Sequence, residues 1–593
     1  MKIIRNTRLW SILTGVFSFL LCILLVGTHF ADSYASMINK ELGISTSVVI
    51  KNEDTDEDTE YYKSNFDSDD ELTQWQIALC EQIQGEGSVL VMNNGALPVA
   101  KGIGVTTFGR SSADIIYGGT GSGQVDTANA ATMSKALTDA GFKVNQPMLD
   151  WYNERIQELK DAGMDRSTPG MFAEFDAVPG LTRIAEIPTD TVRNSGISYD
   201  GYDDLAIVTI GRSGGEGSDL AFGEFSDGYA YFELQEEEKE LLKYVASLNF
   251  DTTVVLINSS NAMALDWIDD PAYGIDACLW IGGPGQYGMN SVAKILCGDI
   301  NPSGKFVDTY AASSLSSPAM QNFGAYTYAN ADPETGTVGG VTIDGARISG
   351  WYGPAMNIHR TPYSGRNFEY YSEDGFLSGV MAAKEVAAAQ SMGLCCYIKH
   401  FALNDFETYR QSVATFATEQ AIREIFLKGF QYAVEDGGAT AVMTSFNRIG
   451  CRWAGAHREL LQNVLRDEWG FVGVVHTDAV MANRNWMDVS IGVEAGNDTW
   501  LSSGDWLVPL IQEWAQEDNK LLANLRNSCH NFLYAYVNST AVNGISSSDR
   551  VVTITPAWQI CVYAADAVVG VLAAAGAVLF IIACIKNRKG AQA

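Results

Sequence analysis

The sequence predicts an α/β protein with two domains, flanked by an apolar helix at each end. Short apolar runs such as 205–210 and 472–475 are bounded by polar and glycine residues, which is typical of strands buried on both faces of a parallel sheet. Longer amphipathic segments such as 233–248 alternate with these runs, as expected of helices that cover such a sheet. A chain of 593 residues exceeds the size of one hydrophobic core, so at least two domains are expected.

The two apolar segments lie near the termini. Residues 9–30 are almost wholly apolar, follow three basic residues and lack a convincing cleavage site, so region 1–30 is predicted to be an uncleaved transmembrane anchor. A second transmembrane helix is predicted at 562–585, before a basic tail at 586–593. Because basic residues stay on the cytoplasmic side, we expect a cell-membrane protein with both termini cytoplasmic and its main body extracellular.

The composition excludes several kinds of partner. The 71 acidic residues outnumber the 39 basic ones, which gives a net charge of −32. Nucleic acid is therefore not expected as a partner, whereas a neutral ligand and association into a homo-oligomer are compatible with this charge. The ten cysteines show no CxxC spacing and the six histidines show no HExxH motif. Buried thiols rather than disulfides are expected, with no metal and no other cofactor.

An acidic linker at 31–71, rich in Asp, Glu, Ser and Thr, precedes the first domain, which is predicted at 72–310. The alternation of strands and helices in this domain favours a parallel sheet covered by helices on both faces. The predicted strands are 88–92, 102–108, 205–210, 253–258 and 278–281, and the predicted helices are 127–140, 233–248 and 287–297. A second linker, rich in Ala, Ser, Gly and Thr, is placed at 311–350.

The second domain, predicted at 351–545, has the same alternation but fewer strands than a closed barrel. The predicted strands are 353–358, 395–400, 440–445 and 472–476, with 494–498 at the end of a fifth. The predicted helices are 378–391, 419–436, 457–468 and 520–536. Since a closed (β/α) barrel needs about eight strands, these predict an incomplete TIM-type barrel with open sheet edges.

Polar residues recur where the strands of the second domain end. They are His359, Arg360, Lys399, His400, Asn404, Ser445, Asn447 and Asp478. In an α/β barrel the carboxyl ends of the strands meet at one mouth, which is where such barrels carry out their chemistry. We therefore expect these side chains to converge on a ligand-binding or catalytic site.

Longer motifs point to one family. The second domain contains SGRNFEYYSED at 364–374, KHFALNDFETYR at 399–410 and GFVGVVHTD at 470–478, which resemble the barrel of glycoside hydrolase family 3, the β-glucosidase-type retaining enzymes. The first domain contains EGSVLVMNNGALPV and GRSGGEGSD, which resemble the α/β sandwich domain of that family. The sandwich precedes the barrel here, which resembles the permuted members of the family.

The resemblance implies a role for each matching residue. Asp478 would be the nucleophile of a retaining β-glycosidase, and Glu216 would be the acid/base supplied by the sandwich domain. Arg366, Lys399 and His400 would bind the hydroxyls of the terminal sugar. The implied reaction is hydrolysis of terminal β-linked sugars from oligosaccharides or other glycosides through a glycosyl-enzyme intermediate. The sequence does not determine which sugar is removed.

Retaining catalysis sets requirements for both carboxyl groups. They must lie about 5–5.5 Å apart, with one ionised to attack and the other protonated to donate. We expect the cations Arg366 and Lys399 to keep Asp478 ionised. Glu216 lies in a glycine-rich loop with Asp219 nearby, so we expect its pKa to be raised.

Three departures from the family pattern leave a second hypothesis open. The strands that normally precede the Arg366 motif have no counterpart in the short segment before it. Phe446, a predicted substrate-binding residue, replaces the usual tyrosine, and Ala479 replaces the tryptophan that often follows the nucleophile. The alternative is a catalytically impaired, internally deleted member that acts as a membrane-tethered carbohydrate-binding protein.

Two glycine-rich motifs suggest other chemistry but lack its context. Residues 211–215 satisfy GxSxG after a strand, yet no helix starts at once and no oxyanion loop is apparent, which argues against a serine hydrolase. The run 118–123 lacks the GK[ST] of a phosphate-binding loop. We predict instead that this run lines the cleft between the two domains.

Overall fold

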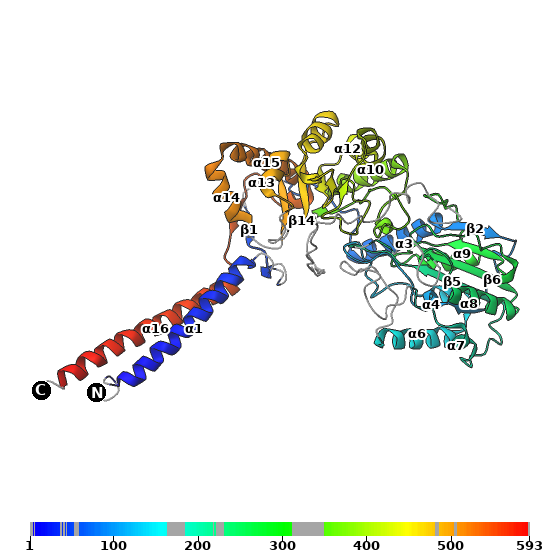
Figure 1. The fold of residues 1–593 in the computed structure, drawn as a ribbon, viewed down its shortest axis with the longest axis horizontal. Coiled ribbons are helices and arrows are strands. Elements are labelled where there is room, and N and C mark those ends of the chain that lie inside the picture. The colour runs from blue at the N-terminus through cyan, green and yellow to red at the C-terminus, as the bar shows by residue number, and fades with distance from the viewer. Residues whose placement is uncertain are drawn as a thin grey trace.

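The computed structural model describes residues 4–590 except for 5, 36–37, 40–41, 43, 52–57, 163–183, 218, 221–229, 311–348, 481–485 and 503–506. Two α/β domains lie next to each other, and a pair of long helices projects from the second domain (Figure 1). The predicted linker at 311–350 falls almost entirely outside the described residues.

The first domain is built on a six-stranded sheet with the order β2-β7-β6-β5-β3-β4. Its strands are β2 (Val89–Asn93), β3 (Gly104–Phe108), β4 (Lys143–Val144), β5 (Leu205–Arg212), β6 (Thr252–Ser259) and β7 (Ala277–Trp280). All neighbouring strands are parallel except β2 and β7, which are antiparallel. The five predicted strands are therefore confirmed, but the expectation of an entirely parallel sheet is wrong at the β2 edge. The two-residue strand β4 was not predicted.

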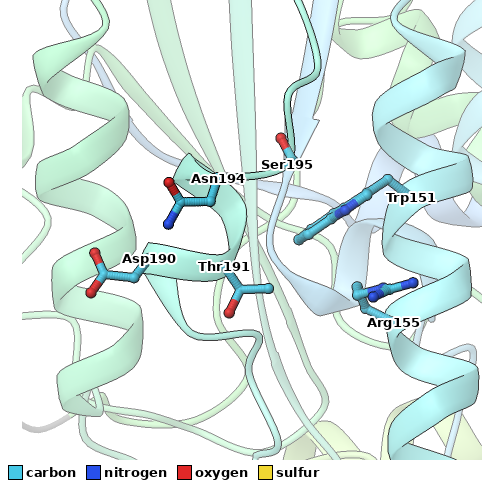
Figure 2. A pocket seen from close by; sticks show the side chains of 6 residues that line it. All are labelled: Trp151, Arg155, Asp190, Thr191, Asn194 and Ser195. Carbon is cyan, nitrogen blue, oxygen red and sulfur yellow. The ribbon is translucent and has the colours of Figure 1, made fainter.

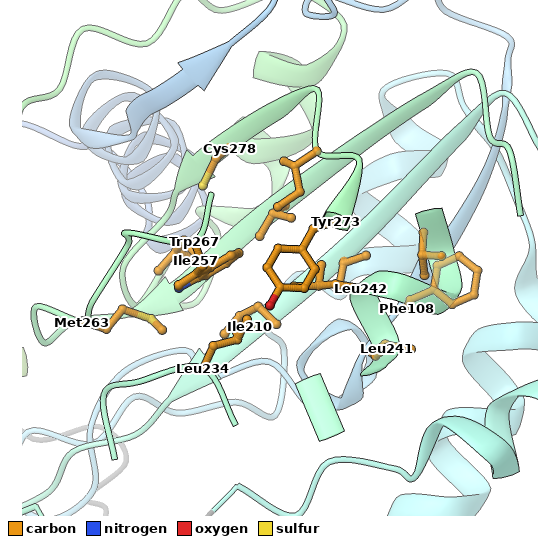
Figure 3. Close-up of a cluster of buried hydrophobic side chains, with 14 of the residues drawn as sticks. Phe108, Ile210, Leu234, Leu241, Leu242, Ile257, Met263, Trp267, Tyr273 and Cys278 are labelled. Atoms are coloured by element: carbon orange, nitrogen blue, oxygen red, sulfur yellow. The ribbon is translucent and has the colours of Figure 1, made fainter. Parts of the chain in front are cut away.

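Helices cover both faces of this sheet because its strand residues alternate between two hydrophobic clusters. Val208 and Val255 belong to the cluster on one face, part of which is drawn in Figure 3. Their neighbours Ile207 and Val254 belong to the cluster on the other face. The covering helices are α6 (Gln146–Asp161) and α8 (Glu236–Ser247) on the first face, and α5 (Met133–Asp139) and α9 (Met289–Leu296) on the second. Of these four helices, only α6 was not predicted.

The second domain contains a five-stranded parallel sheet with the order β15-β14-β11-β9-β8. Its strands are β8 (Gly350–Trp351), β9 (Cys395–Phe401), β11 (Ala441–Thr444), β14 (Val474–Val480) and β15 (Thr499–Ser502). The described residues of this domain thus form a half-barrel sheet, short of the roughly eight strands of a closed barrel. This confirms the prediction of an incomplete barrel for the part of the chain that the structure describes.

Two strand boundaries in this sheet differ from the prediction. The first strand, predicted at 353–358, is regular only over Gly350–Trp351. Pro354 has no N–H to donate, and beyond it the predicted segment pairs with β9 through a single parallel bridge between Ala355 and Lys399. Residues 494–498 do not end the fifth strand but precede it. Helix α13 (Val489–Ala495) ends there on Gly496, whose φ of +116° suits a glycine C-cap.

Two predicted helices on the outer face of the half-barrel occupy the expected positions but are not regular α-helices. The segment predicted at 419–436 combines α11 (Glu419–Ala421), a π-helical turn and α12 (Lys428–Glu435). The segment predicted at 457–468 is a π-helix over Glu459–Glu468. Apolar spacing identifies the buried face of such a segment, but it does not distinguish i→i+4 from i→i+5 hydrogen bonding.

A helix from the end of the chain packs against the half-barrel. Ala535 of α15 (Asn519–Val537) packs in a small cluster with Cys395, Ala441 and Val474. These are the first residues of β9, β11 and β14. These three strand residues alternate with the residues that face α10 (Gly375–Ser391), so they point to the inner face. Helix α15 therefore covers part of the inner face of the half-barrel that the described residues form.

The two ends of the chain lie together. Strand β1 (Ser47–Ile50) pairs antiparallel with β16 (Arg550–Thr553), so the predicted linker at 31–71 contains a paired strand. Helices α1 (Thr7–Ser33) and α16 (Ala557–Gly590) run side by side, with both termini at the same end (Figure 1). Both helices are long and apolar enough to cross a membrane.

Polar side chains join these two helices at the end nearest the second domain. The hydroxyl of Thr28 donates to Asp566 at 2.8 Å. The side chains of Gln559 and Tyr563 donate to Asp32 at 3.0 and 2.9 Å. These interhelical hydrogen bonds hold the two helices together as one pair.

Candidate active site

The candidate site is built around Asp478, which lies inside β14 rather than after a strand that ends at residue 476. Only 8% of its surface is exposed. Its Oδ1 atom accepts a hydrogen bond from the N–H of Ala479 at 2.7 Å. Its Oδ2 atom has no hydrogen-bond partner among the described residues, and Nε2 of His400 lies 3.8 Å from it. A buried carboxylate oxygen without a partner is costly, which indicates a site that a ligand completes.

Arg366 and Lys399 are held by one carboxylate. Nε of Arg366 donates to Oε1 of Glu369, and Nζ of Lys399 lies 3.3 Å from Oε2 of the same residue. Glu369 lies in the short 3₁₀ turn that follows Arg366, whose side chain is completely buried. The sequence motif 364–374 therefore supplies both a cation of the site and the anion that orients it.

Glu216, on the loop after β5, reaches across from the sandwich domain to the same group. Its Oε1 atom lies 3.3 Å from Nη1 of Arg366 and 3.0 Å from Nη2 of Arg410. Its Oε2 atom accepts the N–H of Ser122 at 2.8 Å. The structure thus brings the predicted acid/base into the cluster around Arg366, although by ion pairs that the sequence did not predict.

The glycine run 118–123 closes over this contact. A side chain at Gly121, whose φ is +98°, would place its Cβ 2.4 Å from the Cβ of Glu216. A side chain at Gly119 would place its Cβ 2.1 Å from the ring of Phe368 in the second domain. Only glycine permits these close approaches. This run therefore lies at the contact between the two domains, and the cleft that it was predicted to line stays a prediction.

Asp219 connects the two domains rather than acting on Glu216. Its carboxylate accepts the backbone N–H groups of Gly365 at 3.2 Å, Glu407 at 3.0 Å and Thr408 at 2.9 Å, all in the second domain. Burial raises its pKa to about 7, although these backbone hydrogen bonds oppose the rise. The expectation that Asp219 raises the pKa of Glu216 is wrong, because the carboxylate of Asp219 points toward these three backbone N–H groups.

The pKa of Glu216 is lowered, not raised as predicted. Burial by itself raises its pKa, but the charges of Arg366 and Arg410 and the hydrogen bonds from Ser122 outweigh burial. Glu216 is therefore ionised at neutral pH when no ligand occupies the site. The sequence could not show this, because Arg366 and Arg410 lie about 150 residues or more further along the chain.

The pKa of Asp478 is raised, contrary to the expectation that nearby cations hold it down. Burial is the main cause, and the charge of Glu216 adds to it. Arg410 and Arg366 oppose the rise without cancelling it. Lys399, which was expected to help, is instead paired with Glu369.

His400 is a neutral member of the cluster. Its side chain is 2% exposed, and burial together with the charges of Arg366 and Lys399 holds its pKa well below the ordinary value. The neutral imidazole can donate one hydrogen bond and accept another. It can thus bind a hydroxyl group without adding charge next to Asp478.

Sequence reasoning missed Arg410, which ends the motif 399–410. Nη1 of Arg410 lies 2.8 Å from Oε2 of Glu407, and its guanidinium stacks on the ring of Phe446 at 4.7 Å from the ring centroid. Phe446, predicted to bind substrate, therefore supports a cation of the site. The motif contained the signal, but its partners are set by tertiary contacts.

Other polar residues at the strand ends form structural contacts with neighbouring residues. Nδ1 of His359 lies 2.8 Å from Asp308, and Arg360 pairs with Asp405. The hydroxyl of Ser445 donates to a backbone carbonyl at 2.8 Å. These residues line the same end of the sheet but do not contact Asp478 through any hydrogen bond or ion pair described here.

The predicted site residues do not line either of two surface cavities. One, of about 380 Å³, lies in the sandwich domain between α6 and α7 (Thr189–Arg193) (Figure 2). The other, of about 610 Å³, is lined by residues from 449 to 459. Among the described residues no group of three or more His, Cys, Asp and Glu side chains has an arrangement that could hold a metal ion.

Comparison with known families assigns the chain. Residues 88–377 match the glycosyl hydrolase family 3 C-terminal domain, and residues 310–515 match the glycosyl hydrolase family 3 N terminal domain. Together the two matches extend over most of the chain, with the domain order reversed. The chain belongs to glycosyl hydrolase family 3, as the sequence motifs predicted.

Individual relatives match over short stretches. The chain is 41% identical over 171 residues to beta-glucosidase A of Butyrivibrio fibrisolvens, which covers 29% of this chain and 20% of that protein. It is 38% identical over 193 residues to beta-glucosidase B of Emericella nidulans, which covers 30% and 23%. The chain therefore aligns with about a quarter or less of the length of these relatives.

A solved structure supports the fold. A beta-glucosidase from Paenibacillus barengoltzii superimposes with a TM-score of 0.62 over 79% of this chain and 85% of that chain, at 19% sequence identity. At this identity the similarity establishes the architecture, not the activity.

Proposed function

We propose that this chain hydrolyses terminal β-linked sugars from oligosaccharides or other glycosides with retention of configuration. The observation that carries this proposal is the unpartnered Oδ2 atom of Asp478, buried beside His400 in the cluster of Arg366 and Lys399. A carboxylate held by one oxygen, with the other free to attack, has the form that a covalent nucleophile requires.

The proposed reaction has two steps. In the first, Oδ2 of Asp478 attacks the anomeric carbon, the bond to the leaving-group oxygen breaks, and Glu216 donates its proton to that oxygen. In the second, Glu216 removes a proton from water, which attacks the anomeric carbon and releases Asp478. Arg366, Lys399 and His400 orient the sugar by hydrogen bonds to its hydroxyls.

Substrate binding supplies the protonation state that this mechanism needs. Without ligand, Arg366 and Arg410 keep Glu216 ionised, and only burial favours its protonated form. Sugar hydroxyls that take over hydrogen bonds from these guanidinium groups weaken their hold on Glu216. Burial then dominates, the pKa of Glu216 rises, and the carboxyl group takes up the proton that it later donates.

Replacing Arg410 by methionine should shift the pH dependence of hydrolysis. Arg410 is the first of the cations that lower the pKa of Asp478, so its loss raises that pKa further. Because Asp478 must be ionised to attack, the acidic limb of kcat/KM moves to higher pH. We expect kcat/KM to fall roughly 10²–10³-fold at neutral pH, as for the loss of other preorganised charges.

The matched control is Arg423→Met, which removes an arginine paired with Glu468 at the protein surface. It should leave the pH profile unchanged. The Arg410 variant should also unfold at a lower temperature, because a buried Glu407 is left without its cation at a cost of about 3–5 kcal/mol. An unchanged acidic limb in a folded Arg410→Met protein would contradict the assigned electrostatics.

Two observations favour a second candidate function, a membrane-tethered carbohydrate-binding protein without turnover. Glu216 is ion-paired with two arginines in the ligand-free site. The described residues of the second domain form five strands, where a closed barrel has about eight. In an internally deleted family member, the arginines would still bind sugar hydroxyls. If the unaltered chain releases nitrophenol from an aryl β-glucoside and the Asp478→Ala variant does not, the enzyme is favoured. If the unaltered chain binds sugar but releases no nitrophenol, the second candidate is favoured.

We further propose that α1 and α16 cross the cell membrane, with the body outside and both termini in the cytoplasm. The basic residues lie at the end of the helix pair where both termini are found, and the α/β domains lie at the other end (Figure 1). Basic residues remain on the cytoplasmic side of a membrane. The interhelical hydrogen bonds support the packing of the two spans against each other within the membrane.

Thiol labelling of intact cells tests this topology. A membrane-impermeant maleimide should label Cys451, an exposed thiol of the second domain, in a variant that retains no other cysteine. The same reagent should not label a variant whose single cysteine is Arg588→Cys until the membrane is permeabilised. Labelling of residue 588 in intact cells, or none of Cys451, would contradict the proposed orientation.

A further inference from the structure

The structure points to a second saccharide-binding site in the sandwich domain, in the cavity between α6 and α7. This cavity has a volume of about 380 Å³. It is lined by Trp151, Arg155, Asp190, Thr191, Asn194 and Ser195 (Figure 2). None of these residues belongs to the cluster around Asp478. Helices α6 and α7 lie along the lower edge of the sandwich domain, whereas β14 belongs to the second domain (Figure 1).

Trp151 provides a fixed aromatic wall. It projects from α6 toward Thr191 and Ser195 (Figure 2). One part of its ring packs against the hydrophobic core beneath α6, and it contacts the ring of Tyr152 edge to face at 5.1 Å between centroids. A half-buried indole held in this way offers one apolar surface to a ligand without losing further conformational freedom on binding.

The polar groups around this wall have unused hydrogen-bonding capacity. Nε of Arg155 is buried and has no hydrogen-bond partner among the described residues. Three further polar groups form no hydrogen bond within the part of the chain that the structure describes. They are the indole N–H of Trp151, the hydroxyl of Thr191 and the side-chain amide of Asn194. These three groups can pair with a ligand in the cavity, whereas Nε of Arg155 has almost no accessible surface.

The charges of the cavity favour a neutral ligand. Nη2 of Arg155 lies 2.8 Å from Oε1 of Glu158, and Nη1 of Arg193 lies 3.3 Å from Asp190. Each cation near the cavity is therefore paired with a carboxylate, so no excess positive charge is available for a phosphate or another anion.

A saccharide fits these properties together. Its hydroxyls both donate and accept hydrogen bonds, which matches the mixture of guanidinium, amide, hydroxyl and carboxylate groups. The C–H face of a pyranose ring provides the apolar surface that an indole covers. The cavity volume falls at the lower end of the range of about 300–1,000 Å³ typical of small-molecule sites, so it suits one or two sugar units. Binding here does not depend on hydrolysis at Asp478.

Binding can be measured on the full-length chain in lipid nanodiscs, which avoid glycoside detergents. Asp478→Asn serves as the background so that no probe is consumed. The probes are cellotetraose, laminaritetraose and xylotetraose, titrated by calorimetry. We expect two binding events per chain for at least one probe, and Trp151→Ala should remove one of them or weaken it roughly tenfold. Trp75→Ala, which removes an exposed tryptophan on α3 (Asp69–Gly87), should remove neither.

Thr191→Val and Asn194→Ala provide a second test, because both residues are exposed and their replacement leaves the core intact. Each should weaken the same binding event that depends on Trp151. A single event that depends on Trp151 would support this site even if the proposed active site binds no sugar. If no probe binds in a way that depends on Trp151, Thr191 or Asn194, the proposal is wrong.

Discussion

Replacing Asp478 by asparagine should lower kcat for an aryl β-glycoside by roughly 10⁴-fold or more, because the amide keeps the shape of the side chain but cannot form the glycosyl ester. The same change should not destabilise the fold. Burial raises the pKa of Asp478 above its unfolded value, so its ionisation at neutral pH costs stability in the folded state. The variant should therefore unfold at the same temperature as the unaltered chain or a higher one at pH 7.

Asp498 gives the contrasting control. It is buried like Asp478, but Arg466 pairs with it at 2.8 Å and the N–H of Val475 donates to it at 2.8 Å. Burial raises the pKa of Asp498 as well, so the loss of its charge is not by itself destabilising. Asp498→Asn should nevertheless lower the unfolding temperature, because it leaves the largely buried guanidinium of Arg466 without its anion, while the folded protein keeps its kcat. Azide should restore turnover to Asp478→Gly, because a small anion can occupy the vacated space and attack in place of the carboxylate. An Asp478→Asn protein with a tenth or more of the original kcat would contradict the assignment.

Replacing Glu216 by alanine should have the second-largest effect, and its size should depend on the leaving group. Nitrophenolate leaves without a proton, so kcat for a nitrophenyl glycoside is limited by the second step, where the base is missing. A methyl glycoside or an oligosaccharide needs the proton in the first step. We expect the loss in kcat/KM to be roughly 10²–10⁴-fold for these poor leaving groups and much smaller for nitrophenol.

Glu240→Ala, at an exposed position of α8 in the same domain, is the matched control and should change neither rate. The pH dependence of kcat should also lose its basic limb in the Glu216 variant. That limb reports the deprotonation of the acid in the enzyme–substrate complex. An equal loss for good and poor leaving groups, with the basic limb retained, would show that Glu216 holds Arg366 and Arg410 in place but donates no proton.

The sequence predicted five strands of the first sheet and three of the second, β9, β11 and β14, because each is a short apolar run bounded by polar or glycine residues. Its errors lie where the result depends on tertiary contacts. Pro354 interrupts the segment predicted as the first strand of the half-barrel, which pairs with β9 beyond it only through one bridge at Ala355. Gly496 ends a helix where a strand was expected. Helix α6 was missed although its buried side chains follow a helical spacing.

The candidate site shows the same division. Motifs placed Asp478, Glu216, Arg366 and His400 in one site, and the structure brings them into one cluster. The direction of the pKa shifts could not be predicted, because it depends on which cation pairs with which carboxylate. Arg410 was overlooked for this reason: its importance comes from contacts with residues on another domain and another strand end.

Trapping the covalent intermediate would show whether Asp478 is the nucleophile of a retaining glycosidase. A 2-deoxy-2-fluoro-β-glycoside with a good leaving group slows the second step more than the first, so the glycosyl ester accumulates. Peptide mass spectrometry of the treated protein should find the fluoroglycosyl group on Asp478, and none in Asp478→Asn. A label on another residue, or turnover of the nitrophenyl glycoside with no label at all, would contradict the account.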